Sequence, residues 1–210
     1  IAALAVERQL ARDELGNRNH QLERLANFDP LTGLPNRALL LETLERTLAS
    51  ASRRRCKAAV LFVDLDHFKW VNDELGHQAG DELLREVAQR LREAVRASDA
   101  LGRLGGDEFL VILEALDDLT DAARVADKLV RALAGYYAVG GREIACTASV
   151  GIGVYPDDAH DGESLIAAAD MAMYAVKQGG RNAARAYRPE MTSRKLEAAQ
   201  LGRMLRRALE

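Results

Sequence analysis

Residues 103–110 read RLGGDEFL, and this stretch decides how the middle of the chain folds. Its two glycines lie between segments of strand length, and glycine adopts the positive φ angles of a tight turn without steric cost. We therefore predict a β-hairpin with strands over 100–104 and 108–113, and with the acidic pair Asp107 and Glu108 at its tip. For these residues alone, a surface turn with solvated acids is an open alternative.

An apolar segment upstream also ends in acidic residues. Residues 57–63 read KAAVLFV, have the length and character of a buried strand, and are followed by Asp64 and Asp66. A fold that brings this strand end to the hairpin tip would gather Asp64, Asp107 and Glu108 into an anionic cluster. Mg²⁺ prefers oxygen ligands of this kind. The alternative is that the acids after the strand are solvated. A calcium loop is excluded, because its third acid and obligatory glycine are missing.

The rest of the pattern interleaves helices with strands. We expect helices over 37–50, 68–75, 81–95, 121–134 and 164–178, and strands over 57–63, 100–104, 108–113, 142–155 (one or two) and 182–187. A glycine pair after the last helix is a suitable stop signal. From the first strand onward the order is βααββαβ, which favours an α+β domain with a mixed central β-sheet covered by helices.

Both ends of the chain extend beyond this domain. Residues 1–27 are predicted to be helical, either as a short coiled coil or as a single amphipathic helix. The turn DPLTGLPN at 29–36 ends this helix, and Asn36 or a neighbour can cap the next one. We divide the chain into a helical linker, a domain and a basic helical connector: 1–28, 29–187 and 188–210.

Composition narrows the class of protein. The 210 residues carry a net charge of -3, which suits one domain with extensions and gives no reason to expect nucleic-acid binding. Apolar runs are far shorter than the roughly 20 residues of a membrane span. We expect Cys56 and Cys146 to be reduced and to pack in the interior, as in a cytoplasmic protein. The chain begins at Ile1, so we expect a piece of a longer protein, joined to a membrane only through upstream segments.

In this order, the motifs resemble those of the GGDEF family of diguanylate cyclases, which make cyclic di-GMP from two GTP molecules. The likeness covers roughly residues 29–187. It rests on the opening turn, the strand end DLDHFK, the segment NDELGHQAGD, the GGDEF hairpin and a late Lys and Gly-Arg-Asn, at 29–37, 64–69, 72–81, 105–109 and 177–182. Val176 stands where alanine is more usual. The resemblance implies a nucleotidyl-cyclase-like palm fold.

The resemblance also implies roles for individual residues. Asp64, the carbonyl of Leu65 and Asp107 would hold Mg²⁺ or Mn²⁺. The catalytic residues would be Asp107, which would assist deprotonation, with Glu108 and Lys69. GTP would be bound by Phe68, Asn72, Asp81, Lys177 and Arg181. The alternative for Asn72 and Asp81 is helix capping, since Asp81 precedes a predicted helix.

A further motif resembles the inhibitory site at which this family binds its product. Arg96 and Asp99 have the family's spacing, whereas Lys128 stands where a second arginine is often found. Lysine is a point charge that cannot form the two-pronged contact of arginine, so product inhibition would be weaker. The alternative is an ordinary surface ion pair between Arg96 and Asp99.

The expected function is condensation of two GTP into cyclic di-GMP and two pyrophosphates, by a homodimer with Mg²⁺. The tail resembles a connector to an EAL phosphodiesterase domain, which suggests an alternative: a GTP-binding regulatory GGDEF domain with little synthesis of its own. A purely structural dimerisation module explains the acidic motifs poorly. We expect a cytoplasmic protein, or the cytoplasmic part of a membrane-bound sensor.

Overall fold

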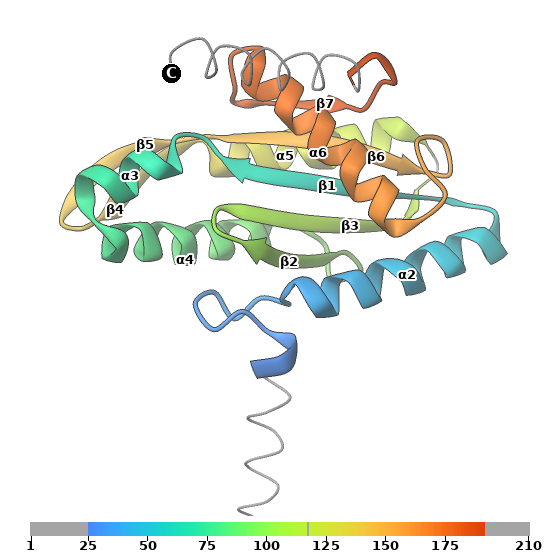
Figure 1. The fold of residues 1–210 in the computed structure, drawn as a ribbon, viewed down its shortest axis with the longest axis horizontal. Coiled ribbons are helices and arrows are strands. Elements are labelled where there is room, and N and C mark those ends of the chain that lie inside the picture. Colours follow the sequence, from blue (N-terminus) through green and yellow to red (C-terminus); the bar gives the residue numbers. More distant parts are fainter. Residues whose placement is uncertain (1–24, 117, 192–210) are drawn as a thin grey trace, which may run out of the picture.

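The computed structural model describes residues 25–116 and 118–191 (Figure 1). Helices and strands follow one another in this order: α2 (Arg37–Arg54), β1 (Lys57–Leu65), α3 (Phe68–Leu75), α4 (His77–Ala94), β2 (Ala100–Gly105), β3 (Glu108–Leu116), α5 (Leu119–Leu133), β4 (Gly135–Val139), β5 (Arg142–Cys146), β6 (Ala148–Tyr155), α6 (Gly162–Gln178) and β7 (Ala183–Ala186).

Five strands form the central sheet, in the order β2-β3-β1-β6-β7. β1 is antiparallel to both β3 and β6, whereas β7 is parallel to β6. The sheet is therefore mixed, as predicted. Its register places Asp64 on β1 directly opposite Glu108 on β3 and Ser149 on β6. β4 and β5 form a separate two-stranded sheet.

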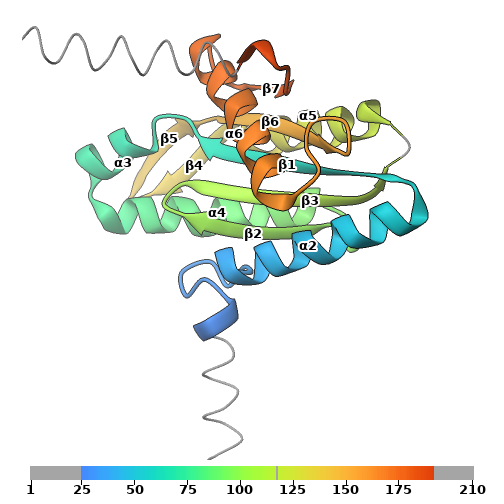
Figure 2. The ribbon, with the colours of Figure 1, turned by 45° about the vertical axis from the view of Figure 1, so that its right-hand side comes forward.

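The sheet has helices on both faces (Figure 2). The side chains of β1 alternate between two core clusters, one on each face. Ala59, Leu61, Val63 and Leu65 share one core cluster with residues of α4 and α5. Ala58, Val60 and Phe62 share a second cluster with residues of α2 and α6. This alternation follows from the two-residue period of a strand. The predicted α+β fold is confirmed.

Several boundaries differ from the predicted ones. α4 begins at His77, because Gly76 with φ +84° turns the chain sharply after α3. Asp81 therefore lies inside the helix, and Asn72 lies inside α3, so the capping alternative is wrong for both. The prediction also missed β4, which pairs with β5 across a two-glycine turn. Residues 142–155 divide into two strands.

The predicted terminal extensions lie mostly outside the described residues. Of the linker 1–28 the structure describes 25–28, and of the connector 188–210 it describes 188–191. Asn36 caps α2 as predicted, since its side chain accepts a hydrogen bond from the Leu39 N–H at 3.1 Å. Within the described ranges, no helix is long and apolar enough to cross a membrane.

Candidate active site

The GGDEF hairpin turns between β2 and β3 and is braced from one side. Gly105 and Gly106 have φ angles of +148° and +52°, which explains the glycine pair. Arg103 donates from Nε and Nη2 to the Gly106 carbonyl at 2.9 and 2.7 Å. Its Nη1 contacts both carboxylate oxygens of Asp29 at 3.0 and 3.1 Å. Arg103 thus ties the hairpin tip to the opening turn of the domain.

Asp64, Asp107 and Glu108 form the predicted acidic cluster. Asp64 is only 5% exposed, and Glu108 lies opposite it in the sheet. Burial raises the pKa of Asp64 to about 6; the charges of Asp107 and Glu108 add to this rise, and Lys177 opposes it. Burial and the neighbouring Asp107 also raise the pKa of Glu108. Burial is the largest cause of both shifts, and the neighbouring negative charges add to it.

Lys177 reaches this cluster from α6. Its Nζ lies 2.6 Å from Oδ1 of Asp64. The ammonium group therefore pairs with this buried oxygen and opposes the rise in the pKa of Asp64. The other carboxylate oxygens of Asp64, Asp107 and Glu108 are ligands of the kind that a divalent cation prefers. The described residues contain no ready-made group of three or more His, Cys, Asp or Glu side chains that could hold a metal. Other oxygens would have to complete the coordination.

Three of the residues predicted to bind GTP come together where α3 packs on α4. Phe68 and Asn72 belong to α3, and Asp81 belongs to α4. A Cβ atom on Gly80 would lie 2.0 Å from Oδ1 of Asn72 and 3.2 Å from the Phe68 ring. Glycine at position 80 therefore leaves the space that the Asn72 side chain occupies, one residue before Asp81. The sequence analysis included Gly80 in the segment 72–81 but gave it no role, because the predicted helix began only at residue 81.

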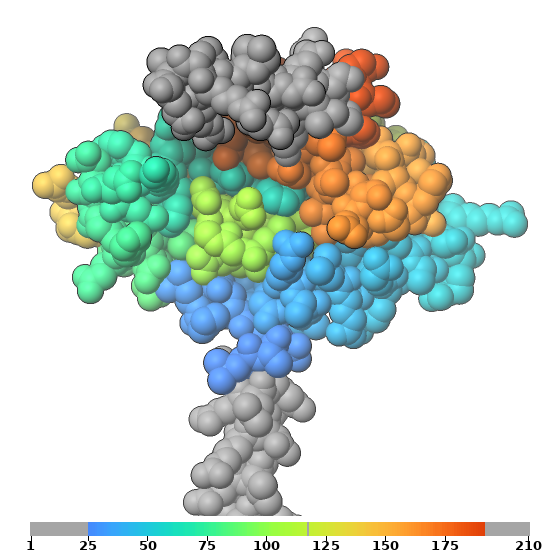
Figure 3. Space-filling model, in the orientation of Figure 1, coloured from blue at the N-terminus to red at the C-terminus, as the bar shows by residue number. Residues whose placement is uncertain are grey.

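Lys69 and Arg181, which are also predicted site residues, lie at the end of the sheet that carries Asp64. Lys69 follows the end of β1, and Arg181 precedes β7, which pairs with β6 beside that end. Both side chains are exposed. Figure 3 shows the hairpin at the surface, between α3 on one side and α6 on the other. Asp64 and Asp66 are both buried, so the alternative that they are solvated is wrong.

The predicted product site lies beside a separate cavity of about 310 Å³ between the end of α4 and α5. Arg96, Asp99, Arg124 and Lys128 are among its lining residues. The Asp99 carboxylate accepts a hydrogen bond from the backbone N–H of Arg96 at 3.1 Å. Among the described side chains no ion pair joins Arg96 to Asp99, so the ion-pair alternative is wrong. Lys128 donates to the Ala94 carbonyl at 2.7 Å.

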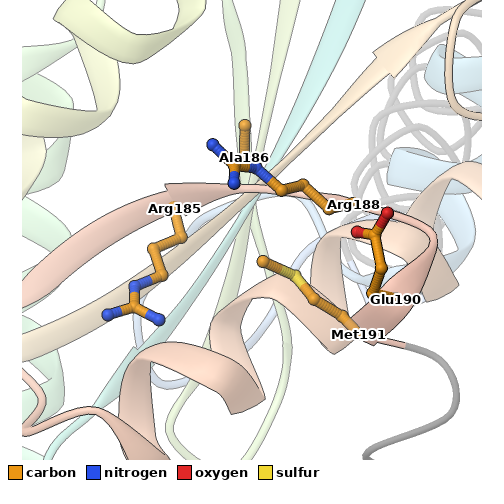
Figure 4. Close-up of a pocket in the computed structure, with 5 residues that line it drawn as sticks. All are labelled: Arg185, Ala186, Arg188, Glu190 and Met191. Atoms are coloured by element: carbon orange, nitrogen blue, oxygen red, sulfur yellow. The ribbon is translucent and has the colours of Figure 1, made fainter.

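Another cavity, of about 540 Å³, lies beside β7 (Figure 4). The described residues that line it are Arg185, Ala186, Arg188, Glu190 and Met191. None of the predicted site residues is among them. The candidate active site described above is therefore separate from this cavity.

Comparison with known proteins identifies the family. Residues 26–183 match the family described as diguanylate cyclase, GGDEF domain. The chain therefore belongs to the GGDEF-domain family of diguanylate cyclases. It is 45% identical over 196 residues to the bifunctional diguanylate cyclase/cyclic di-GMP phosphodiesterase MucR of Pseudomonas aeruginosa; this covers 93% of the chain and 28% of MucR. It spans 42% of the diguanylate cyclase TpbB, so it corresponds to less than half of these relatives.

Solved structures agree with the fold. The GGDEF domain of TpbB from Pseudomonas aeruginosa superposes with a TM-score of 0.77 at 40% identity, covering 81% of this chain and 99% of that one. The coiled coil and GGDEF domain of DgcB from Caulobacter crescentus, solved in complex with c-di-GMP, gives a TM-score of 0.78 at 28% identity, covering 88% and 97%. The mixed sheet and its helices are thus those of a GGDEF domain.

Proposed function

We propose that this domain is a diguanylate cyclase, which condenses two GTP into cyclic di-GMP and two pyrophosphates. The observation that carries the proposal is the intact acidic cluster of Asp64, Asp107 and Glu108, which Lys177 faces. The residues proposed to bind the base, Asn72 on α3 and Asp81 on α4, follow β1 in the chain. The family match and the names of its relatives support the same activity.

Asn72 on α3 and Asp81 on α4 would select the base. Guanine presents N1–H and N2–H donors, which the Asp81 carboxylate can accept, and Asn72 can offer a donor and an acceptor to the base edge. Adenine lacks that donor pair. Binding adenine would leave a carboxylate unpaired, at a cost of roughly 1–3 kcal/mol. Asn72 and Asp81 would therefore favour GTP over ATP.

The triphosphate and the reacting hydroxyl of GTP would bind at the end of the sheet that carries the hairpin. Asp64, the Leu65 carbonyl and Asp107 would hold the metal ions, with Mg²⁺ or Mn²⁺ as the expected ion. When bound, such an ion supplies positive charge that stabilises the α-phosphate and the leaving pyrophosphate. The Asp107 carboxylate would accept the proton of the ribose 3′-hydroxyl, and Glu108 supports it. Lys69, Lys177 and Arg181 would neutralise the triphosphate.

Two bonds must form between two nucleotides, whereas one domain offers one such set of residues for GTP. The reaction therefore requires two domains facing each other, and we propose a homodimer aligned by the linker 1–28. We place the reaction in the cytoplasm. A purely regulatory role toward a downstream EAL domain, reached through the connector 188–210, is the less favoured reading, because no acid of the cluster has been lost.

The deciding experiment incubates the purified chain with GTP and Mg²⁺ and separates the nucleotides by chromatography. We expect cyclic di-GMP, and a rate per domain that rises with protein concentration as dimers form. A chain fused to a strong dimeric coiled coil serves as the control for weak dimerisation. If that fused dimer binds GTP and releases no cyclic di-GMP, the domain is regulatory and the proposal is wrong.

Replacing Gly80 with alanine should weaken GTP binding without unfolding the domain. The new Cβ would displace the Asn72 side chain, which can rotate away. Losing its contact with the base should raise the GTP dissociation constant about 10- to 100-fold. Calorimetry measures this, and Gly135→Ala is the matched control, since its Cβ would meet only Arg90, at 3.4 Å. Unchanged GTP affinity in Gly80→Ala would place the base elsewhere.

Arg96→Ala should weaken cyclic di-GMP binding and relieve product inhibition, while the initial rate stays unchanged. Arg96 lines the cavity at the end of α4, which is separate from the acidic cluster. Product bound there can inhibit only by favouring a domain arrangement that separates the two GTP sites. We expect Lys128→Arg to tighten product binding, because arginine can contact guanine with two donors. Arg85, which is exposed on α4, provides the control variant Arg85→Ala.

The measurement is calorimetry with cyclic di-GMP, together with initial rates at increasing product concentration. Equal cyclic di-GMP affinity in Arg96→Ala and the parent chain would show that this cavity is not the product site.

A further inference from the structure

Asp66 lies two residues after Asp64, yet its carboxylate is held quite differently. It is 4% exposed and accepts three hydrogen bonds. Thr147 donates its hydroxyl to Oδ2 at 2.6 Å, and Ser149 donates its hydroxyl to Oδ1 at 2.7 Å. The backbone N–H of Asn182 donates to Oδ2 at 3.1 Å. Asp66 thus joins the end of β1 to the start of β6 and to the turn between α6 and β7.

That turn has an unusual backbone. Gly180, Arg181 and Asn182 all have positive φ angles, of +117°, +64° and +45°. Residues other than glycine rarely have positive φ angles. Consecutive residues in this conformation therefore need contacts with other parts of the protein to hold them. The Arg181 N–H bonds the Val176 carbonyl at 3.0 Å, which closes the end of α6. The next N–H, that of Asn182, is the one that Asp66 accepts.

The same short segment carries two of the cations assigned to the triphosphate. Lys177 is in the last turn of α6 and reaches Asp64, and Arg181 is inside the turn. Immediately after the turn, Ala183 pairs with Ser149, whose hydroxyl also bonds Asp66. Two contacts therefore hold residues 177–182 near Asp64. One is the ion pair of Lys177 with Asp64, and the other is the hydrogen bond from the Asn182 N–H to Asp66.

We propose that Asp66 is a positioning residue that holds the α6–β7 turn and so sets Lys177 and Arg181 toward the triphosphate. It is not a metal ligand. Three donors already occupy three of the roughly four lone-pair sites of the Asp66 carboxylate, whereas Asp64 lies beside Asp107 and Glu108 with Lys177 against its Oδ1. That Lys177 and Arg181 contact the triphosphate rests on the proposed function. That Asp66 holds the α6–β7 turn does not depend on that function.

The first test measures amide hydrogen exchange in the full 210-residue chain, without nucleotide. In Asp66→Asn an NH₂ group replaces one acceptor oxygen, so exchange in a peptide covering residues 177–183 should become about tenfold faster. Asp158→Asn is the matched control, because Asp158 also accepts a backbone N–H, from Val154 at 2.8 Å, near the other end of β6. Exchange at the parent rate in Asp66→Asn would overturn the proposal, whether or not the chain makes cyclic di-GMP.

A milder variant covers the case in which Asp66→Asn does not fold. Thr147→Val keeps the side-chain shape and the carboxylate but removes one donor to Oδ2. It should speed exchange in the same peptide by roughly threefold. No change in Thr147→Val, combined with misfolding of Asp66→Asn, would also overturn the proposal, because Asp66 would then support the core and not the turn.

The second test separates positioning from metal binding. For Asp66→Asn we expect about a tenfold higher KM for GTP, a kcat within about threefold of the parent value, and an unchanged Mg²⁺ concentration for half-maximal activity. A tenfold higher Mg²⁺ requirement at an unchanged KM would make Asp66 a ligand and the proposal wrong. If the parent chain proves inactive, the GTP dissociation constant from calorimetry replaces KM, and a constant equal to the parent's overturns the proposal.

Discussion

Replacing Asp107 with alanine is expected to abolish cyclic di-GMP synthesis, by about a thousandfold or more, in a domain that remains folded. Asp107 lies in the hairpin turn between β2 and β3, where it is half-buried and not part of either core cluster. Removing it takes away a carboxylate for the metal and the proposed proton acceptor. It also removes a negative charge that raises the pKa of Asp64.

The measurement is chromatography of nucleotides after incubation with GTP and Mg²⁺, alongside thermal unfolding. Glu143→Ala, which removes an exposed acid on β5, is the control and should keep parental activity. A folded Asp107→Ala protein with near-normal turnover would exclude Asp107 from the reaction.

Most of the sheet could be predicted because its signals are local. The apolar run of β1, the glycine turn between β2 and β3 and the glycine stop after α6 each depend on adjacent residues. β4 was missed because it directly follows α5, and its turn at Gly140 and Gly141 was not recognised as a second hairpin. The start of α4 was misplaced because Gly76 turns the chain between two helices that are nearly continuous in sequence.

The acidic cluster could be predicted because a resemblance supplied the pairing of its parts. The contacts that support it could not, because they join distant residues without a motif. Asp66 meets its three donors across 81, 83 and 116 residues of sequence. Arg103 meets Asp29 across 74 residues. When a polar residue lies at a strand end, the sequence does not show whether its hydrogen bonds are made with water or with a hydroxyl group far away in the chain.

Asp64→Asn should also abolish synthesis, but it should stabilise the fold at neutral pH. Burial holds the pKa of Asp64 at about 6 in the folded protein, above the ordinary value of 3.8. The folded state therefore keeps this proton at pH values where the unfolded chain has lost it. Stability from this group is full below pH 4 and falls as the pH rises toward 6. At pH 7 the charged carboxylate costs up to about 3 kcal/mol, given the shift from 3.8 to about 6.

Asparagine has nearly the same shape and no charge, so the variant avoids this cost. We expect Asp64→Asn to unfold at higher urea concentration than the parent at pH 7, with the difference shrinking toward pH 4.5, where Asp64 is mostly protonated. The measurement is urea unfolding from pH 4.5 to 8 in EDTA without nucleotide, with exposed Asp73→Asn as the control. Lower stability of Asp64→Asn at pH 7 would show that the ion pair with Lys177 outweighs burial.

Loss of activity with a gain in stability would separate the two roles of this position. An amide binds Mg²⁺ much less well than a carboxylate, so synthesis is lost for the same reason that stability is gained: the negative charge has gone. Natural sequences keep a destabilising buried charge where a function needs it. The ordinary core residues beside Asp64 on β1, Val63 and Leu65, carry no such conflict.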